Sequence, residues 1–187
     1  MQFFTALLYF SAGGTALAQR WDGWHPGPWH GHNDGPAKVI DLSGSGWTLT
    51  SQNGSIKVPA MVPSQQYLDL YNANIIPDPL FGENNAMLAW VRDQNWTYSR
   101  TVQGLELGPR GSGIPTFVVF EGLDTFTTIT VCGMQVATTE NMYRQYVFEI
   151  IDVLRSCRGS PELSIDFGPA TTITHQLSAE SMDGEND

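Results

Sequence analysis

Positive charge is scarce in this sequence. Nine lysines and arginines stand against nineteen aspartates and glutamates, a net charge of −10 over 187 residues. The only lysines are Lys38 and Lys57, and the arginines are scattered, so no basic stripe exists to neutralise a phosphate backbone. We therefore expect neither nucleic-acid binding nor attachment to an anionic membrane surface.

Length and long apolar runs are also lacking. A (β/α)8 barrel takes about 250 residues, so an enzyme of that architecture does not fit in 187. No run of about 20 apolar residues is present, so no membrane-spanning helix is expected. With 41% apolar and 15% charged residues, the sequence predicts one domain with a packed core.

The first 18 residues have the pattern of a secretory leader. An apolar stretch from Phe3 to Phe10 is followed by small residues and then by Ala16-Leu17-Ala18. Small side chains at Ala16 and Ala18 suit signal-peptidase cleavage after Ala18. We expect residues 1–18 to be removed and the protein to be secreted.

Cysteine usage and two sequons agree with a secretory route. The two cysteines, Cys132 and Cys157, either form a disulfide or remain separate thiols, and the sequence leaves both alternatives open. The tripeptides beginning at Asn53 and Asn95 match the N-glycosylation pattern.

Residues 19–37 are rich in Trp, His, Gly and Pro without a period, which predicts a flexible lead-in. His25, His30 and His32 are the only candidate metal ligands there. Their spacing matches no zinc pattern, so neither a metal nor another cofactor is expected.

Beyond residue 38 the sequence predicts short antiparallel strands separated by turns. Ser64 suits the N-cap of a single helix from 65 to about 73, on whose apolar face Leu68 and Tyr71 lie, with Ile75 just past its end in line with them. Asn53-Gly54 and Cys132-Gly133 are expected in tight hairpin turns. Residues 38–169 form the expected domain, and 170–187 a disordered, polar, acidic tail. The expected strands are 39–42, 47–50, 56–58, 87–91, 96–102, 116–120, 126–131, 135–139, 146–150 and 162–167.

The second half of the sequence contains four blocks in order: residues 117–126 (FVVFEGLDTF), the turn glycine Gly133, residues 141–150 (NMYRQYVFEI) and residues 152–154. Together these blocks resemble the N-terminal domain of glycoside hydrolase family 2. The first half is similar to the β-mannosidase branch. Its matching blocks are Val58-Pro59, Val62-Pro63-Ser64, Leu68-Asp69-Leu70, Asp78-Pro79, Phe81-Gly82, Asn84, Trp90-Val91 and Asn95-Trp96-Thr97-Tyr98-Ser99.

The resemblance implies an all-β, galactose-binding-like jelly-roll sandwich with one short helix. In the family this domain precedes an immunoglobulin-like domain and a catalytic barrel that removes terminal β-D-mannose with retention of configuration. Retention needs two carboxyl groups about 5 Å apart, and both belong to the barrel. The chain alone is therefore expected to be inactive, with no catalytic residue of its own.

This sequence also departs from the family. Asn85, Ala89 and Cys132 replace an acid, an arginine and an asparagine. The family's Trp-Asp-Trp-Gly segment, which reaches the sugar, does not follow residue 167, and Trp21-Asp22-Gly23-Trp24 lies in the wrong place to replace it. The resemblance thus implies a jelly roll that lacks its last strands and exposes a sheet edge.

Two other functions remain open. An independent carbohydrate-binding module would use exposed tryptophans. The candidates are Trp90 and Trp96 within the domain, and Trp21, Trp24 and Trp29 in the lead-in. For Trp90 and Trp96 the alternative is packing in the core. An interaction protein would pair through the open sheet edge. A serine or cysteine nucleophile lacks partners, because the only histidine outside the lead-in is His175 in the tail.

Overall fold

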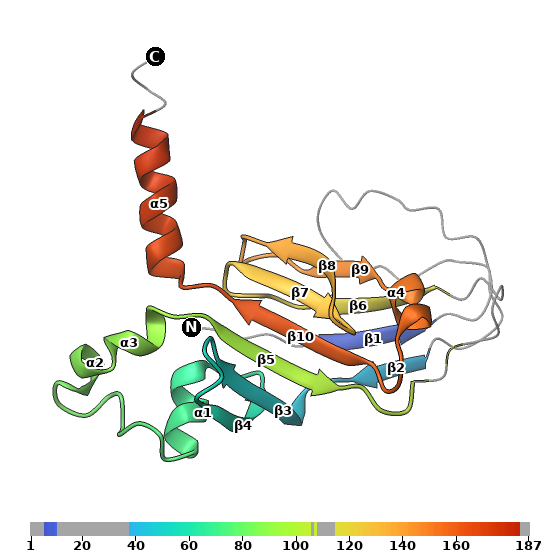
Figure 1. Ribbon diagram of the computed structural model, residues 1–187, viewed down its shortest axis with the longest axis horizontal. Coiled ribbons are helices and arrows are strands. Elements are labelled where there is room, and N and C mark those ends of the chain that lie inside the picture. The colour runs from blue at the N-terminus through green and yellow to red at the C-terminus, as the bar shows by residue number, and fades with distance from the viewer. Residues whose placement is uncertain (1–5, 11–37, 106, 108–114, 184–187) are drawn as a thin grey trace.

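The computed structural model describes residues 6–10, 38–105, 107 and 115–183. The lead-in over residues 19–37, with its three histidines and three tryptophans, lies outside the described residues, as do residues 11–18 with the expected cleavage site. Two antiparallel sheets stack against each other, as the sequence predicts, and a long helix leaves the body at one end (Figure 1).

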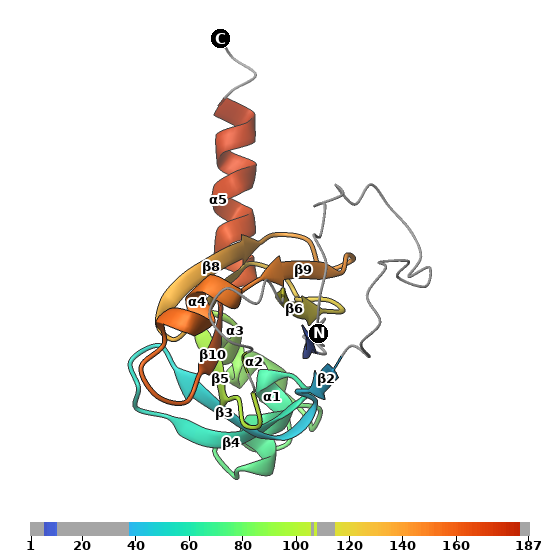
Figure 2. The ribbon, with the colours of Figure 1, turned by 90° about the vertical axis from the view of Figure 1, so that its right-hand side faces the viewer.

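The larger sheet has six strands in the order β4-β3-β5-β10-β7-β8, and the smaller has four in the order β2-β1-β6-β9. Figure 2 shows the two sheets end on. The strands of the larger sheet are β3 (Gly44–Ser51), β4 (Lys57–Val62), β5 (Trp96–Thr101), β7 (Thr127–Val131), β8 (Met134–Thr139) and β10 (Glu162–Phe167). Those of the smaller are β1 (Ala6–Phe10), β2 (Lys38–Asp41), β6 (Thr116–Phe120) and β9 (Tyr146–Glu149).

Alternating burial explains the sandwich. Every second residue of β4, β7 and β10 is buried, as expected when one face of each strand packs on the core. Within that core the rings of Tyr98 and Phe167 meet edge to face with centroids 5.8 Å apart. The largest fully buried side chains are Trp96, Tyr98, Phe120, Phe167, Leu42, Leu49, Leu70, Leu123, Ile129 and Ile165.

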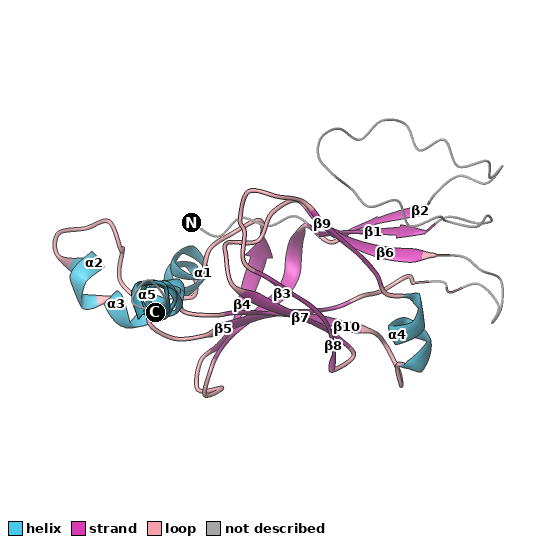
Figure 3. Cartoon of the chain, turned by 90° about the horizontal axis from the view of Figure 1, so that it is seen from above, coloured by secondary structure: helices cyan, strands magenta, loops and turns pink. Residues whose placement is uncertain are grey.

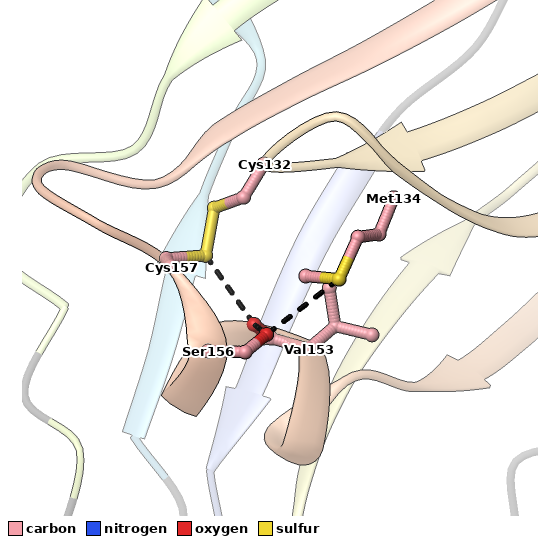
Figure 4. The surroundings of a disulfide bond; sticks show 5 residues. All are labelled: Cys132, Met134, Val153, Ser156 and Cys157. Carbon is pink, nitrogen blue, oxygen red and sulfur yellow. Dashed lines mark hydrogen bonds between the residues drawn. A yellow bond between two sulfur atoms is a disulfide. The ribbon is translucent and has the colours of Figure 1, made fainter.

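The hairpin between β7 and β8 turns at Cys132-Gly133, as predicted. Both residues have positive φ, +52° and +75°, as a two-residue type I′ turn requires. Cys132 forms a disulfide with Cys157, which ends helix α4 (Ile151–Ser156) (Figure 4). The bond closes a separation of 25 residues, a loop for which closure entropy predicts a stabilisation of about 3 kcal/mol.

The expectation of a strand over 87–91 is wrong. The chain forms two single helical turns there, α2 (Asn84–Met87) and α3 (Ala89–Arg92). The Leu88 amide donates to Asn84 O at 2.9 Å, and the Val91 amide to Leu88 O at 3.0 Å. Leu88 and Val91 are the buried side chains, three residues apart, so the burial follows a helical spacing rather than the alternation of a strand.

The expectation of a disordered tail is also wrong for most of its length. Residues Ala170–Asp183 form helix α5, directly after Pro169. The hydroxyl groups of Thr174 and Ser178 donate to carbonyls four residues earlier, at 2.6 and 2.9 Å. Figure 1 shows α5 projecting away from both sheets, and its described side chains are exposed apart from the half-buried Ile173.

The remaining corrections concern turns and caps. The described residues contain five helices rather than one, and the expected helix is α1 (Gln66–Asn72). Gln65 occupies its N-cap position without a side-chain cap, whereas the Ser64 hydroxyl donates to Gln65 O at 3.5 Å. Only Gly54 of the Asn53-Gly54 pair has positive φ, and the loop from β3 to β4 spans 52–56 rather than two residues.

Candidate docking surface

Seven large apolar side chains of one chain segment face solvent. They are Leu68, Tyr71, Ile75, Leu80, Phe81, Met87 and Trp90, which we name the helical apolar surface. Leu80 is 92% exposed and Phe81 74% exposed. The segment comprises α1 to α3, and Figure 3 shows these helices at the end of the molecule opposite α4. Large apolar side chains exposed together on a soluble domain indicate a contact surface.

Helix α1 exposes some of its apolar side chains to water. Leu68 and Tyr71 of α1, and Ile75 beyond its end, are each more than 40% exposed, while Asp69 and Leu70 are buried. The Tyr67 hydroxyl donates to Leu88 O at 3.1 Å and ties α1 to the turn between α2 and α3. This bond links α1 to the other two helices.

A buried carboxylate fixes the orientation of α1. The Tyr98 hydroxyl on β5 donates to Asp69 Oδ2 at 2.7 Å, and the Met61 amide on β4 donates to Oδ1 at 3.3 Å. Asp69 is only 3% exposed, and its burial raises the pKa of its carboxyl, while the bonds from Tyr98, Ser64 and Met61 oppose that rise. Burial and the neighbouring Asp69 likewise raise the pKa of Tyr98. These bonds hold the side of α1 that carries Asp69 and Leu70 inward, and they leave Leu68 and Tyr71 exposed.

The two candidate sugar-binding tryptophans have different environments. Trp96 is 1% exposed and donates from Nε1 to Val91 O at 2.7 Å, so its ring offers no face to a ligand. Trp90 is 40% exposed on α3, and its ring centroid lies 6.3 Å from that of Trp96. Only Trp90 of this pair is available for stacking.

A polar groove of about 460 Å³ lies beside β3 and β5. The Arg100 guanidinium there donates to the carbonyls of Leu42 and Ser43 at 2.7 and 3.2 Å. The groove is lined by Ile40, Leu42, Gly46, Thr48, Lys57, Ser99, Arg100, Thr101, Gln103 and Glu162, and thus contains no aromatic ring on which a sugar could stack. It is a weaker candidate than the helical apolar surface.

Metal and membrane sites are not found in the part of the chain that the structure describes. No three His, Cys, Asp or Glu side chains there gather closely enough to hold a metal ion. None of the helices in that part is both long and apolar enough to cross a bilayer.

The sequon asparagines lie near each other. The Gln52 amide donates to Asn95 O at 3.1 Å, which joins the loop that carries Asn53 to the start of β5. Asn53 is exposed and its Oδ1 accepts bonds from the Ser55 amide and hydroxyl, whereas Asn95 is half-buried.

Comparisons with known proteins agree on one family. A family model described as "Glycosyl hydrolase 2 galactose-binding domain-like" matches residues 47–186. Beta-mannosidase A from Aspergillus niger is 45% identical over 144 residues, and that from Aspergillus terreus is 42% identical over 144 residues; each match covers 76% of this chain. The chain spans about 15% of the length of these relatives.

A solved structure shares the fold. The crystal structure of a beta-D-mannosidase from Dictyoglomus thermophilum superposes with a TM-score of 0.63 at 27% identity. The match covers 73% of this chain and 16% of that one. The sequence resemblance to the β-mannosidase branch is therefore confirmed.

Replacing Tyr98 with Phe removes the short bond to Asp69. We expect the free energy of unfolding at pH 7 to fall by about 2 kcal/mol, the usual worth of a hydrogen bond to a charged group. Because the Tyr98 bond favours the ionised carboxylate, this difference shrinks as the pH falls through the raised pKa of Asp69. As the pH falls through that window, the wild type gains stability from Asp69, because the folded state binds the proton of this carboxyl more tightly than the unfolded state does. Urea unfolding at a series of pH values measures both effects.

Tyr146→Phe is the matched control. Tyr146 is also buried, but its hydroxyl donates to the neutral carbonyl of Asn141 at 2.7 Å. The loss of stability caused by Tyr146→Phe should not vary with pH in the same window. Equal pH dependence in the two variants would contradict an ionised Asp69 as the partner of Tyr98.

Proposed function

Because this chain belongs to the family of glycosyl hydrolase 2 galactose-binding-like domains, we propose that it acts as a non-catalytic domain of a secreted β-mannosidase-like glycoside hydrolase. The reaction of the whole enzyme would be retaining hydrolysis of terminal non-reducing β-D-mannose. The catalytic carboxyl pair and the β-mannoside would lie in a barrel, with an immunoglobulin-like domain beside it. This chain would support the barrel.

The helical apolar surface is the observation that carries the proposal. Leu80 and Phe81 lie at its most exposed point, and covering such side chains contributes about 1.5–3 kcal/mol each. Its three helices stand apart from the disulfide end of the sandwich, so a large partner can cover them without disturbing the sheets (Figure 1). We assign the remaining domains of the enzyme as that partner.

Secretion and glycosylation belong to the same proposal. The leader pattern supports cleavage after Ala18, and the Cys132–Cys157 disulfide suits an oxidising compartment. The exposure of Asn53 in its loop leaves room for a glycan, and half-buried Asn95 is the more constrained acceptor.

A chimera tests the docking surface. The segment of Aspergillus niger beta-mannosidase A that matches this chain is exchanged for the corresponding residues of this chain. We expect the chimera to hydrolyse p-nitrophenyl β-D-mannoside. Phe81→Asp should lower its half-life at elevated temperature by about tenfold or more, because a charge would be buried against the partner domains.

Tyr143→Asp provides the control for this chimera. Tyr143 is an aromatic residue with 89% exposure, and it lies between β8 and β9, outside the helical apolar surface. Tyr143→Asp should leave the half-life of the chimera unchanged. A chimera in which both variants behave like the parent would contradict docking through α1 to α3.

A second candidate function rests on Trp90. Its ring is 40% exposed, as stacking on a sugar requires. If the domain binds carbohydrate by itself, calorimetric titration with mannobiose or mannan should release heat that Trp90→Ala abolishes and Tyr143→Ala preserves. The absence of heat at millimolar mannobiose would rule this function out.

A further inference from the structure

A strand from the expected leader lies inside the smaller sheet. Strand β1 (Ala6–Phe10) pairs with β6 from Ala6 opposite Phe120 to Phe10 opposite Thr116. On its other side β1 pairs with β2, from Leu7 opposite Asp41 to Phe10 opposite Lys38. Both pairings are antiparallel, and because β1 is paired on both sides it is an interior strand and not an addition at the edge.

The space that β1 occupies has the width of one strand. Neighbouring strands lie about 4.8 Å apart, so the facing backbones of β2 and β6 are separated by roughly 9.6 Å. Within the described residues, β1 is the only strand paired with β2. Removing it would leave two facing rows of backbone amides and carbonyls without their partners.

The flanking strands differ in how much they depend on this partner. Thr116, Val118, Val119 and Phe120 of β6 are buried, and β9 holds its other side. Three of the four residues of β2 are exposed. Strand β6 therefore provides a preformed, anchored edge. Strand β2 pairs with the other side of the strand that binds to this edge.

We propose that the slot between β2 and β6 is a peptide-binding site that retains the leader strand non-covalently after the chain is cut following Ala18. Its ligand is an extended peptide with the sequence of residues 6–10, running antiparallel to both neighbours. Backbone bonds to two strands provide the affinity, as in strand addition to a sheet edge, here on both sides at once. The processed protein would then carry its own leader as a bound peptide.

The test uses the full chain cut after folding. A protease recognition sequence is placed between Ala18 and Gln19, and the chain is made without export in an oxidising cytosol. After cleavage, size-exclusion chromatography with mass detection should show fragment 1–18 eluting with the rest. Hydrogen exchange should show β2 and β6 protected to the same extent before and after the cut. Excess synthetic peptide of residues 5–11 should release the fragment.

Proline substitutions separate strand pairing from other attachment. A competitor peptide with Leu8→Pro lacks a central amide and should fail to release the fragment, although the protein is unchanged. In the chain itself, Leu8→Pro should release the fragment upon cutting, whereas Thr15→Pro, outside β1, should not.

Two results would overturn the proposal. One is immediate loss of the wild-type fragment on cutting; the other is equal competition by the two peptides. Since no hydrolysis is measured, either result would leave the proposed role in a β-mannosidase-like enzyme untouched.

Discussion

The packing of the inward face of the six-stranded sheet against β6 is the interaction on which the rest of this domain depends. Leu49, Ile129 and Ile165 are fully buried on that face, and Val118 and Phe120 of β6 are equally buried. Because β4, β7 and β10 contribute only alternate residues to the core, their outward side chains are free to be polar. The disulfide between the β7–β8 turn and the end of α4 closes this sandwich at one end.

At the other end, one buried carboxylate determines which surface the domain offers. Asp69 holds the inner side of α1 against β4 and β5 through Tyr98 and Met61, so Leu68 and Tyr71 on the other side face water. A charge placed in the core is costly unless it is well bonded. Because the Asp69 carboxylate anchors α1, we regard the exposed face of α1 as a property of the fold. The exposed faces of α2 and α3 belong to the same surface.

Much of the sheet structure was predictable because burial with a period of two is visible in sequence. The expected strands over 116–120 and 162–167 coincide with β6 and β10, and the one over 126–131 is one residue longer than β7. The turn at Cys132-Gly133 lies where it was expected, between two strands. The strand expected over 87–91 failed because its buried residues, Leu88 and Val91, are three apart and its local bonds are helical. Residues 170–183 were polar enough to suggest disorder, yet they form α5. The pairing of β1 depends on strands more than 25 residues away, which no local pattern reveals.

Only part of the candidate site could be predicted from the sequence. Leu68 and Tyr71 are both exposed on α1, whereas Ile75, expected on the same face, lies beyond the end of the helix. An apolar face normally indicates the core, but here Asp69 and Leu70 are the residues of α1 that are buried. Leu80 and Phe81 lie in a segment whose residue types predict a turn, and nothing in that pattern indicates a contact surface. The disulfide was one of two open alternatives, since the distance between the cysteines cannot be read from sequence.

The central claim is that this domain supports catalysis without performing it. The most direct measurement is turnover of p-nitrophenyl β-D-mannoside by the purified, oxidised chain, beside beta-mannosidase A from Aspergillus niger at equal molar concentration. The account predicts no release of p-nitrophenol above the blank. Turnover that follows the chain through successive purification steps, with retention of configuration, would contradict it.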